Sequence, residues 1–315
     1  MKRSFPAARV TPLFLAPLLL AGPVWRERSP MPVARAGCIA GPWRGQLLVA
    51  GGSYWETGVK HYSARTDLFD PANNRWTPGP PLPAARSDAA AAIGDGNSLY
   101  VFGGTVDGIL TDTALVFNGK TWREDATRRL ASPTAYAAAA VIGADMYLFG
   151  GLAKLGEIST AASTLHRFRR SWQPCPAFPG AARITAAVTA HQGRLYVFGG
   201  VSQTAGQAIE NRRDAWSFDP AANRWNRLRD LPVARRAWSA VSSGDRILLL
   251  GGYTDTYSDE IYSFDPAGGT YEAAGNLPHA IADPRFVVLG RLLLNAGGES
   301  GDKIRAPWTW ETTLP

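Results

Sequence analysis

The sequence is poor in the residues that build disulfide-stapled or metal-centred folds. It has two cysteines and four histidines among 315 residues, too few for a disulfide framework or a zinc site. Cys38 falls in an apolar, strand-like run, and Cys175 stands between two prolines. We therefore expect two unpaired thiols. The histidines are scattered without ligand spacing, so the sequence predicts no metal.

The excess of positive over negative charge is also small. Lysine and arginine exceed aspartate and glutamate by 33 − 26 = 7, and Lys2, Arg3 and Arg9 supply three of these charges, which leaves 7 − 3 = +4 for the rest. Without a basic run, so mild a balance gives no reason to expect a nucleic-acid partner. It is compatible with a small anionic substrate.

Beyond the first 22 residues no apolar run is long enough to span a membrane. Residues 1–22 begin with Lys2 and Arg3, continue with an apolar stretch over 13–20 interrupted at Pro17, and end on small residues. That layout is typical of a secretory signal peptide. We therefore expect export to the periplasm or the medium, with 23–315 as the folded body. Without export, the protein is expected in the cytoplasm.

Glycine, proline and tryptophan, in contrast, are plentiful, and the glycines recur in pairs. The pairs stand at 51–52, 103–104, 150–151, 199–200, 251–252 and 297–298, each after an apolar run, with spacings of 52, 47, 49, 52 and 46 residues. An aromatic residue precedes each pair by 26 to 28 positions: Trp25, Trp76, Trp122, Trp172, Trp225 and Tyr271. Six copies of one unit therefore cover residues 24–315.

Each unit has the features of four short antiparallel strands. Turn residues separate the apolar runs at all-β spacing, Asp-Pro pairs at 70–71, 219–220 and 265–266 start turns, and no helical period persists. The aromatic residue is large enough to fill the wedge between adjacent sheets. A ring of such sheets keeps the exposed strand edges short. The sequence therefore predicts an all-β propeller.

The glycine pair, the aromatic residue and the Pro-x-x-Arg turn together resemble the kelch repeat, which implies a six-bladed propeller. The last copy ends soon after Trp310 without an aromatic fourth strand of its own, while residues 24–26 stand unattached at the front. We expect this N-terminal segment to supply the outer strand of the last blade and close the ring.

Four arginines occupy equivalent positions just before the innermost strand of their units. They follow the proline turns: Arg35, Arg86, Arg183 and Arg235, with Tyr136 in the corresponding place of the third copy. They are expected to ring the mouth of the channel as a positive funnel for an anion, since guanidinium groups match carboxylates. The alternative is that each arginine only hydrogen-bonds the backbone of its own turn.

The sixth copy differs from the others after its glycine pair. Glu299 follows directly and Arg305 stands six residues later, across a short hairpin. An acid at this bend is expected near the channel, where burial can tune its pKa for proton transfer. The alternative is a solvated loop glutamate with a surface arginine.

The local sequences around 36–52, 178–200 and 295–305 resemble the N-acetylneuraminate epimerase (sialic acid mutarotase) branch of kelch proteins in circularly permuted form. The resemblance implies interconversion of the α and β anomers of a sialic acid without metal or nucleotide. It implies Glu299 as acid/base and Arg305 as its positive partner, with Arg35, Arg86, Arg183 and Arg235 as further candidates for the substrate carboxylate. The inter-strand loops look shorter than those of the family.

Other functions are left open by the sequence. A non-catalytic kelch module that binds a protein or glycan through its loops is the main alternative, and a mutarotase for another acidic sugar is the next. A copper radical oxidase would need a Cys, Tyr and His cluster that is not recognisable here. Most aromatic residues are expected in the core between sheets, with Tyr54, Trp55 and Trp308 near a face where a sugar stacks.

Overall fold

The computed structural model describes residues 22–94 and 97–314. The expected signal sequence, residues 1–22, therefore lies outside the described residues except for Gly22. No helix in the described part is long and apolar enough to cross a membrane.

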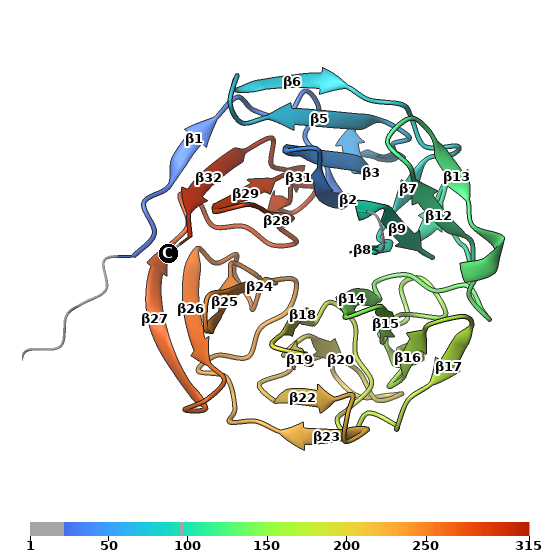
Figure 1. Ribbon diagram of the computed structural model, residues 1–315, viewed down its shortest axis with the longest axis vertical. Helices are drawn as coiled ribbons and strands as arrows, with labels where there is room; N and C mark the ends of the chain where they lie inside the picture. Colours follow the sequence, from blue (N-terminus) through green and yellow to red (C-terminus); the bar gives the residue numbers. More distant parts are fainter. Residues whose placement is uncertain (1–21, 95–96, 315) are drawn as a thin grey trace, which may run out of the picture.

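The described residues form six antiparallel sheets of four or five strands, which stand around one central axis (Figure 1), and three smaller sheets. Sheet 1 contains β2 (Ala36–Trp43), β3 (Gln46–Glu56), β5 (Thr66–Asp70) and β6 (Arg75–Pro78), with β4 (Val59–Tyr62) pairing to the far end of β3. Sheet 2 contains β8 (Ala90–Ile93), β9 (Leu99–Phe102), β12 (Ala114–Phe117) and β13 (Trp122–Glu124). Sheet 3 contains β14 (Ala138–Ile142), β15 (Asp145–Phe149), β16 (Leu165–Phe168) and β17 (Trp172–Pro174).

The remaining three sheets repeat this order. Sheet 4 contains β18 (Ala187–His191), β19 (Arg194–Phe198), β22 (Ala215–Asp219) and β23 (Arg224–Arg227). Sheet 5 contains β24 (Ser239–Ser243), β25 (Arg246–Leu250), β26 (Glu260–Asp265) and β27 (Thr270–Asn276). Sheet 6 contains β28 (Phe286–Leu289), β29 (Leu292–Ala296), β32 (Thr309–Thr313) and, at its outer edge, β1 (Arg26–Arg28).

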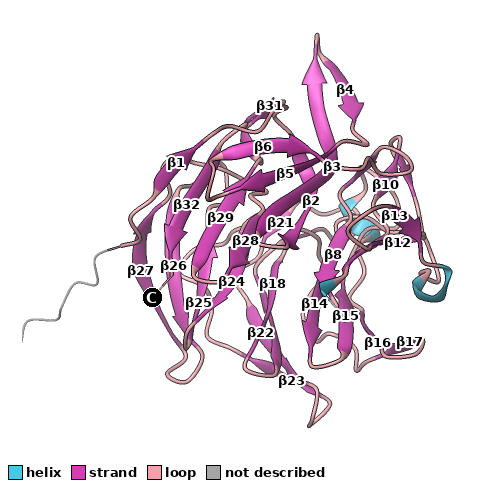
Figure 2. Ribbon diagram, turned by 45° about the horizontal axis from the view of Figure 1, so that its top comes forward, coloured by secondary structure: helices cyan, strands magenta, loops and turns pink. Residues whose placement is uncertain are grey.

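Short elements lie on one face; apart from the strand at 86–87, which precedes the first strand of sheet 2, they stand between the second and third strands of the sheets. They are β7 (Arg86–Ser87), β10 (Thr105–Val106), β11 (Ile109–Leu110), β20 (Val201–Ser202), β21 (Glu210–Asn211), β30 (Glu299–Gly301) and β31 (Ile304–Arg305), with the 3-10 helix η3 (Ile158–Thr160). A second 3-10 helix, η2 (Ala126–Arg128), follows β13. The hairpin β3–β4 projects furthest from this face (Figure 2).

The Asp-Pro pairs form the turns that the sequence predicts, and the aspartate side chain is the reason. Asp70 accepts hydrogen bonds from the backbone amides of residues 72 and 73, and Asp219 does the same for residues 221 and 222. Such side-chain caps favour a turn over a continued strand. The third and fourth strands of sheets 1 and 4 are thereby held as tight hairpins.

In sheets 1, 3 and 4 the tryptophan of the fourth strand ties its sheet to the segment that arrives from the preceding sheet. The Nε1 of Trp76 donates to the carbonyl of Ser29, and that of Trp172 donates to Arg128. Trp225 bonds Pro176 in the same way. The indole therefore fills apolar space between sheets while its one donor is satisfied.

Buried apolar clusters lie between neighbouring sheets. One joins Ile39 and Leu48 of sheet 1 to Val101 of sheet 2, and four more join the following pairs in turn. Another packs Leu294 of sheet 6 against Val49 of sheet 1. The last sheet in the chain is thus packed against the first.

The N-terminal segment pairs with the last strand, as expected for an outer strand supplied from the front of the chain. Arg26, Glu27 and Arg28 pair with residues 311, 310 and 309 of β32. Thr312 Oγ1 donates to the carbonyl of Val24, and Arg28 forms an ion pair with Glu311 at 3.2 Å. Trp25 packs on the cluster between sheets 5 and 6, with its ring 5.8 Å from that of Phe286.

If this segment stabilises sheet 6, Trp25→Ala lowers the free energy of unfolding by about 3 kcal/mol, the lower end for truncation of a tryptophan because this ring is only partly buried. Val24→Ala is the control, since the Val24 side chain is exposed and its loss costs about 0.5 kcal/mol or less. Urea denaturation of both variants measures the difference. Equal stabilities would show that the segment contributes no packing.

Candidate active site

The chain enters the innermost strand of every sheet through a residue with left-handed backbone. These six residues, called the mouth ring below, are Gly37, Asp88, Tyr136, Thr185, Ala237 and Asp283, with φ of 66°, 57°, 58°, 52°, 51° and 51°. A positive φ is uncommon outside glycine and is costly for a bulky residue. Five non-glycine residues in this conformation therefore mark a turn that the surrounding structure enforces.

Backbone hydrogen bonds connect members of the mouth ring. The amides of Asp88 and Tyr136 donate to the carbonyls of Gly37 and Asp88, and those of Ala237 and Asp283 donate to the carbonyls of Thr185 and Ala237. The amide of Gly37 donates to the Asp283 carboxylate at 2.7 Å. The turns of sheets 6, 1, 2 and 3 are thus linked, as are those of sheets 4, 5 and 6.

Gly37 is required where two acidic side chains approach the backbone. A Cβ at this position would lie 2.5 Å from Asp88 Oδ1 and 2.5 Å from Ser87 Oγ. The absence of a side chain therefore lets Asp88 and Ser87 lie against residue 37, while Asp283 accepts a hydrogen bond from its amide.

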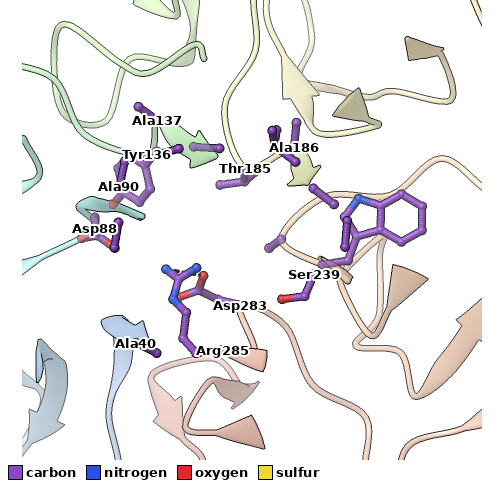
Figure 3. Close-up of a pocket in the computed structure, with 18 of the residues that line it drawn as sticks. Ala40, Asp88, Ala90, Tyr136, Ala137, Thr185, Ala186, Ser239, Asp283 and Arg285 are labelled. Atoms are coloured by element: carbon purple, nitrogen blue, oxygen red, sulfur yellow. Dashed lines mark ion pairs between the residues drawn. The ribbon is translucent and has the colours of Figure 1, made fainter. Parts of the chain in front are cut away.

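Below the mouth ring lies a central cavity of about 230 Å³ (Figure 3). Much of its wall is alanine from the innermost strands, because small side chains leave the axis open. Its charged lining residues are Asp88, Asp283 and Arg285. Arg285 Nε donates to the carbonyl of Cys38 at 2.7 Å, and Nη2 lies 2.9 Å from Asp283 Oδ1.

Glu299 and Arg305 meet across the hairpin β30–β31. Their Cα atoms are register partners, and Arg305 Nη1 lies 3.0 Å from Glu299 Oε1. The Arg305 side chain is 9% exposed and that of Glu299 is 35% exposed. The pair is therefore sheltered but open to a small molecule.

The glycine pair fixes Glu299 at the rim of the mouth. Residue 299 pairs with Ala282, the neighbour of Asp283 in the mouth ring. Each residue that follows a glycine pair pairs in this way with the neighbour of a ring residue. The other five are Ser53, Thr105, Leu152, Val201 and Tyr253. Glu299 is the single carboxylate among the six.

Burial raises the pKa of Glu299 above its ordinary value of 4.5, although the charge of Arg305 opposes this. Asp283 and Asp88 raise the pKa further, and Lys60 lowers it. A carboxylate and its acid form are thereby brought closer in energy near neutral pH. This is the condition for a group that both accepts and returns a proton.

Two tyrosines stand near this carboxylate as neutral hydrogen-bond donors. Burial raises the pKa of Tyr136, and the nearby Asp88 and Asp283 charges add to the effect. Burial and the Glu299 charge raise the pKa of Tyr257. Both phenols therefore keep their protons at physiological pH.

The four arginines predicted to line the mouth do not do so. They are 0–3% exposed, and each Nη1 donates to the carbonyl of the first glycine of the pair in its own sheet: Arg35 to Gly51, Arg86 to Gly103, Arg183 to Gly199 and Arg235 to Gly251. Other guanidinium donors bond further backbone, an acid or, in Arg86, the Thr113 hydroxyl, whereas the Nε of Arg35 and of Arg235 has no partner among the described residues. The prediction of a positive funnel at the mouth is therefore wrong, because the guanidinium groups form their hydrogen bonds inside the turns.

The acidic or polar partner differs from sheet to sheet. Arg183 contacts both carboxylate oxygens of Asp214, at 2.9 and 2.7 Å. Arg35 pairs with the buried Asp67, and Arg235 pairs with Glu260. Arg86 has Thr113 instead. Burial lowers the pKa of Arg86 to about 10, since no carboxylate compensates for its desolvation at short range.

Tyr136 does not occupy the arginine position of the third sheet. A Cβ on Gly103 would touch the Thr134 carbonyl, just as one on Gly51 would touch the Arg86 carbonyl. Thr134 is therefore the counterpart of the arginines, and Tyr136 belongs to the mouth ring two residues later.

The aromatic residues expected near a sugar-binding face divide into two groups. Trp55 and Tyr54 lie on the projecting strand β3, where Lys303 Nζ stands 5.0 Å from the Trp55 ring and Tyr54 stacks on His61. Trp308 stacks on His279 at 4.3 Å and lies 5.5 Å from Trp310, while His279 and Trp310 are 5.8 Å apart between ring centroids. The three rings therefore pack together as one cluster.

Both cysteines are free thiols, and burial raises the pKa of Cys38 to about 11. In the part of the chain that the structure covers, no three His, Cys, Asp or Glu side chains are grouped to hold a metal ion.

Comparison with known proteins agrees with the repeat pattern. Kelch-like protein 35 of Mus musculus is 26% identical over 249 residues, which is 78% of this chain and 41% of that protein. Kelch-like protein 25 of Rattus norvegicus is 24% identical over 270 residues, 84% of this chain and 36% of that protein. The chain belongs to the kelch-repeat family. It spans about two fifths of the length of these kelch relatives.

Part of the kelch chain is also similar to an enzyme. The family described as N-acetylneuraminate epimerase matches residues 162–263. An N-acetylneuraminate epimerase of Yersinia enterocolitica is 31% identical over 136 residues, which is 42% of this chain and 34% of that protein.

Sequence reasoning missed most residues of the mouth ring and three residues near it. Asp88, Asp283, Arg285, Tyr257 and Lys60 carry charge or a phenol toward the mouth without matching the kelch pattern. A signal was nevertheless available for the ring. Its members always stand two residues after the kelch arginine or its counterpart, so aligning the six units at the arginine would have found them.

The buried Arg183–Asp214 pair makes a pH-dependent contribution to stability. Burial alone would raise the pKa of Asp214, but hydrogen bonds from Arg183 and its charge lower it to about 2, from an ordinary 3.8. Because the folded-state pKa is depressed, the stabilisation is present above about pH 4 and is lost as pH falls toward 2.

Asp214→Asn is therefore expected to destabilise the kelch fold by about 3–5 kcal/mol at neutral pH, since it leaves Arg183 buried without its counter-charge. The difference in unfolding free energy between wild type and Asp214→Asn should become smaller as the pH falls from 4 to 2. Asp245→Asn is the control, because that side chain is 86% exposed. Urea unfolding at several pH values measures both, and a pH-independent gap would contradict the ion-pair explanation.

Proposed function

We propose that the six sheets are the blades of a six-bladed kelch propeller latched by β1, and that the protein is a mutarotase for an acidic sugar. Its substrate would be N-acetylneuraminate or a related sialic acid, with α and β anomers interconverted. Similarity of residues 162–263 to N-acetylneuraminate epimerase supports this substrate class. The observation that carries the proposal is the sheltered Glu299–Arg305 pair, which the pairing of residue 299 with Ala282 places beside the mouth ring.

The reaction requires two proton transfers and no change of oxidation state. The base removes the proton of the anomeric hydroxyl, the C2–O6 bond breaks, and the ring oxygen takes up a proton. The open keto acid rotates about C2–C3 and recloses on the other face, which returns both protons. A single carboxyl group that alternates between its two forms serves every step.

Arg305 suits the substrate because the carboxylate and the anomeric hydroxyl of a sialic acid sit on the same carbon. A group that grips the carboxylate must therefore stand next to the base. Arg305 Nη1 lies 3.0 Å from Glu299 Oε1, so the guanidinium stands directly beside the proposed base. Its planar set of donors can hold Glu299 with one edge and a carboxylate with another.

The raised pKa of Glu299 fits its proposed role. General acid–base catalysis is most efficient when the pKa of the group lies near the working pH, and it contributes about 10²–10⁴-fold. A carboxylate left at an ordinary pKa would accept a proton from the anomeric hydroxyl less readily. Burial among the mouth residues supplies the difference.

Glu299→Gln is expected to remove the acceleration of anomer equilibration, because an amide neither accepts nor delivers the proton. A sialidase releases the pure α anomer of N-acetylneuraminate, and its decay is followed by NMR with and without protein. Asp302→Asn is the matched control, since this exposed acid lies on the same hairpin. Equal rates for wild type and Glu299→Gln would overturn the proposal.

Activity should fall as pH drops through the raised pKa of Glu299, because the base form is lost. The charge of Arg305 lowers the pKa of Glu299. In Arg305→Met the fall of kcat/KM at low pH, called the acidic limb of the pH profile, should therefore move to higher pH. The same substitution should also raise KM. Arg305→Lys keeps the charge and should move the limb less. An unchanged limb in Arg305→Met would show that Glu299 does not set the profile.

A non-catalytic interaction module is the second candidate, and exposed apolar side chains favour it. The loops that follow the glycine pairs place such residues on the face that carries the mouth: Val59, Ile109, Ile209 and Ile304. The similarity to Kelch-like proteins supports this alternative as well. In that case wild type leaves the anomers to equilibrate at the spontaneous rate.

A further inference from the structure

The hairpin β3–β4 projects further from the mouth face than the other short elements there (Figure 2). In sheet 1 the second strand continues past its glycine pair to Glu56 and returns as β4. Its register pairs Ser53 with Tyr62 and Trp55 with Lys60. Directly opposed residues of an antiparallel pair share one face of the sheet. These four side chains therefore lie on one face of the hairpin.

That face looks inward over the mouth, because its two flanks touch the neighbouring hairpins on either side. On the β3 flank, the Trp55 ring is covered by Lys303 of the hairpin that carries Glu299 and Arg305. On the β4 flank, Tyr62 lies against Gly108 of β10–β11 in sheet 2, where an added Cβ would stand 3.0 Å from the Tyr62 ring. Lys60, between these two contacts, is consequently directed toward the mouth.

Lys60 differs from the other cations of the mouth in having no ionic partner. Arg305 pairs with Glu299 and Arg285 pairs with Asp283. Among the described residues, no carboxylate lies within 4 Å of Lys60 Nζ, which stands 5.1 Å from the centre of the Tyr62 ring. Its charge is nevertheless felt by both Glu299 and Asp88, so the ammonium is near the mouth without being neutralised there.

We infer that Lys60 is the residue of the β3–β4 hairpin that binds the anionic group of the sugar and so restricts the proposed mutarotase to acidic substrates. The inference rests on the proposed function and extends it. With Arg305 beside Glu299 on the hairpin β30–β31 and Lys60 on the adjoining hairpin β3–β4, both cations can contact a carboxylate at the anomeric carbon while the anomeric hydroxyl faces the base. A neutral sugar would leave the lysine without a partner.

The first test separates binding from chemistry in the α-anomer assay. Lys60→Met is expected to raise KM for N-acetylneuraminate roughly 10-fold or more, as loss of a charge-assisted hydrogen bond does, with kcat within about threefold of wild type. Lys60→Arg should restore most of the affinity. Lys154→Met is the control, because Lys154 is exposed in the corresponding loop of sheet 3 and pairs with Glu157.

A pH profile distinguishes a ligand-binding lysine near the base from one that only supports the hairpin. Because the charge of Lys60 lowers the pKa of Glu299, Lys60→Met should shift the acidic limb of kcat/KM to higher pH, whereas a purely structural loss would lower activity equally at every pH. An unchanged KM and an unchanged limb in a folded Lys60→Met protein would overturn the inference and leave the proposed mutarotase intact.

A binding experiment covers the case in which the protein is not a mutarotase. Glu299→Gln, which should not turn over substrate, is titrated with equilibrated N-acetylneuraminate by calorimetry, with and without Lys60→Met. Binding that is lost with Lys60 supports the lysine even if wild type accelerates nothing. Absence of binding in a protein that is also inactive would remove both the inference and the proposed function.

Discussion

The structure depends on the turn that leads into each innermost strand. In four of the six sheets a buried arginine ties that turn to the first glycine of the pair in the same sheet. The glycine in turn lies against the carbonyl of the arginine position in the next sheet, so close that a Cβ on Gly51 would stand 2.2 Å from Arg86 O. Each turn thus holds its own sheet together and positions its neighbour. The left-handed residues of the mouth ring follow from this constraint.

A regular backbone with irregular side chains is what allows chemistry at the mouth. The mouth ring and the positions after the glycine pairs have nearly the same backbone in all six sheets, yet they carry glycine, aspartate, tyrosine, threonine, alanine, leucine, valine, serine and glutamate. One carboxylate, Glu299, stands where five neutral side chains stand elsewhere. The ordered main chain provides rigidity, and the pKa of that carboxylate is set by a few charges around it.

The sequence predicted the all-β repeat architecture, because Gly-Gly, aromatic and proline signals recur at a regular interval and each has a local cause. It also predicted the Glu299–Arg305 contact, since six residues across a short hairpin bring the two side chains together. It was wrong about Arg35, Arg86, Arg183 and Arg235. Their position before the inner strands suggested exposure, but hydrogen-bonding demand inside the turn decides where a guanidinium goes. Lys60 and Arg285 were missed because their approach to the mouth arises only when distant sheets assemble.

The pairing of β1 with β32 has a consequence for how the molecule is made. Sheet 6 is built from residues near both ends of the chain, since Arg28 pairs with Thr309. A ribosome therefore releases the last strand of this sheet long after the first has emerged, and the early strand must wait without its partner. Contacts of such high sequence separation slow folding. Until β32 has been made, β1 and the apolar face of sheet 1 that packs on sheet 6 stay uncovered, so the nascent chain passes through a stage at which it is prone to aggregate.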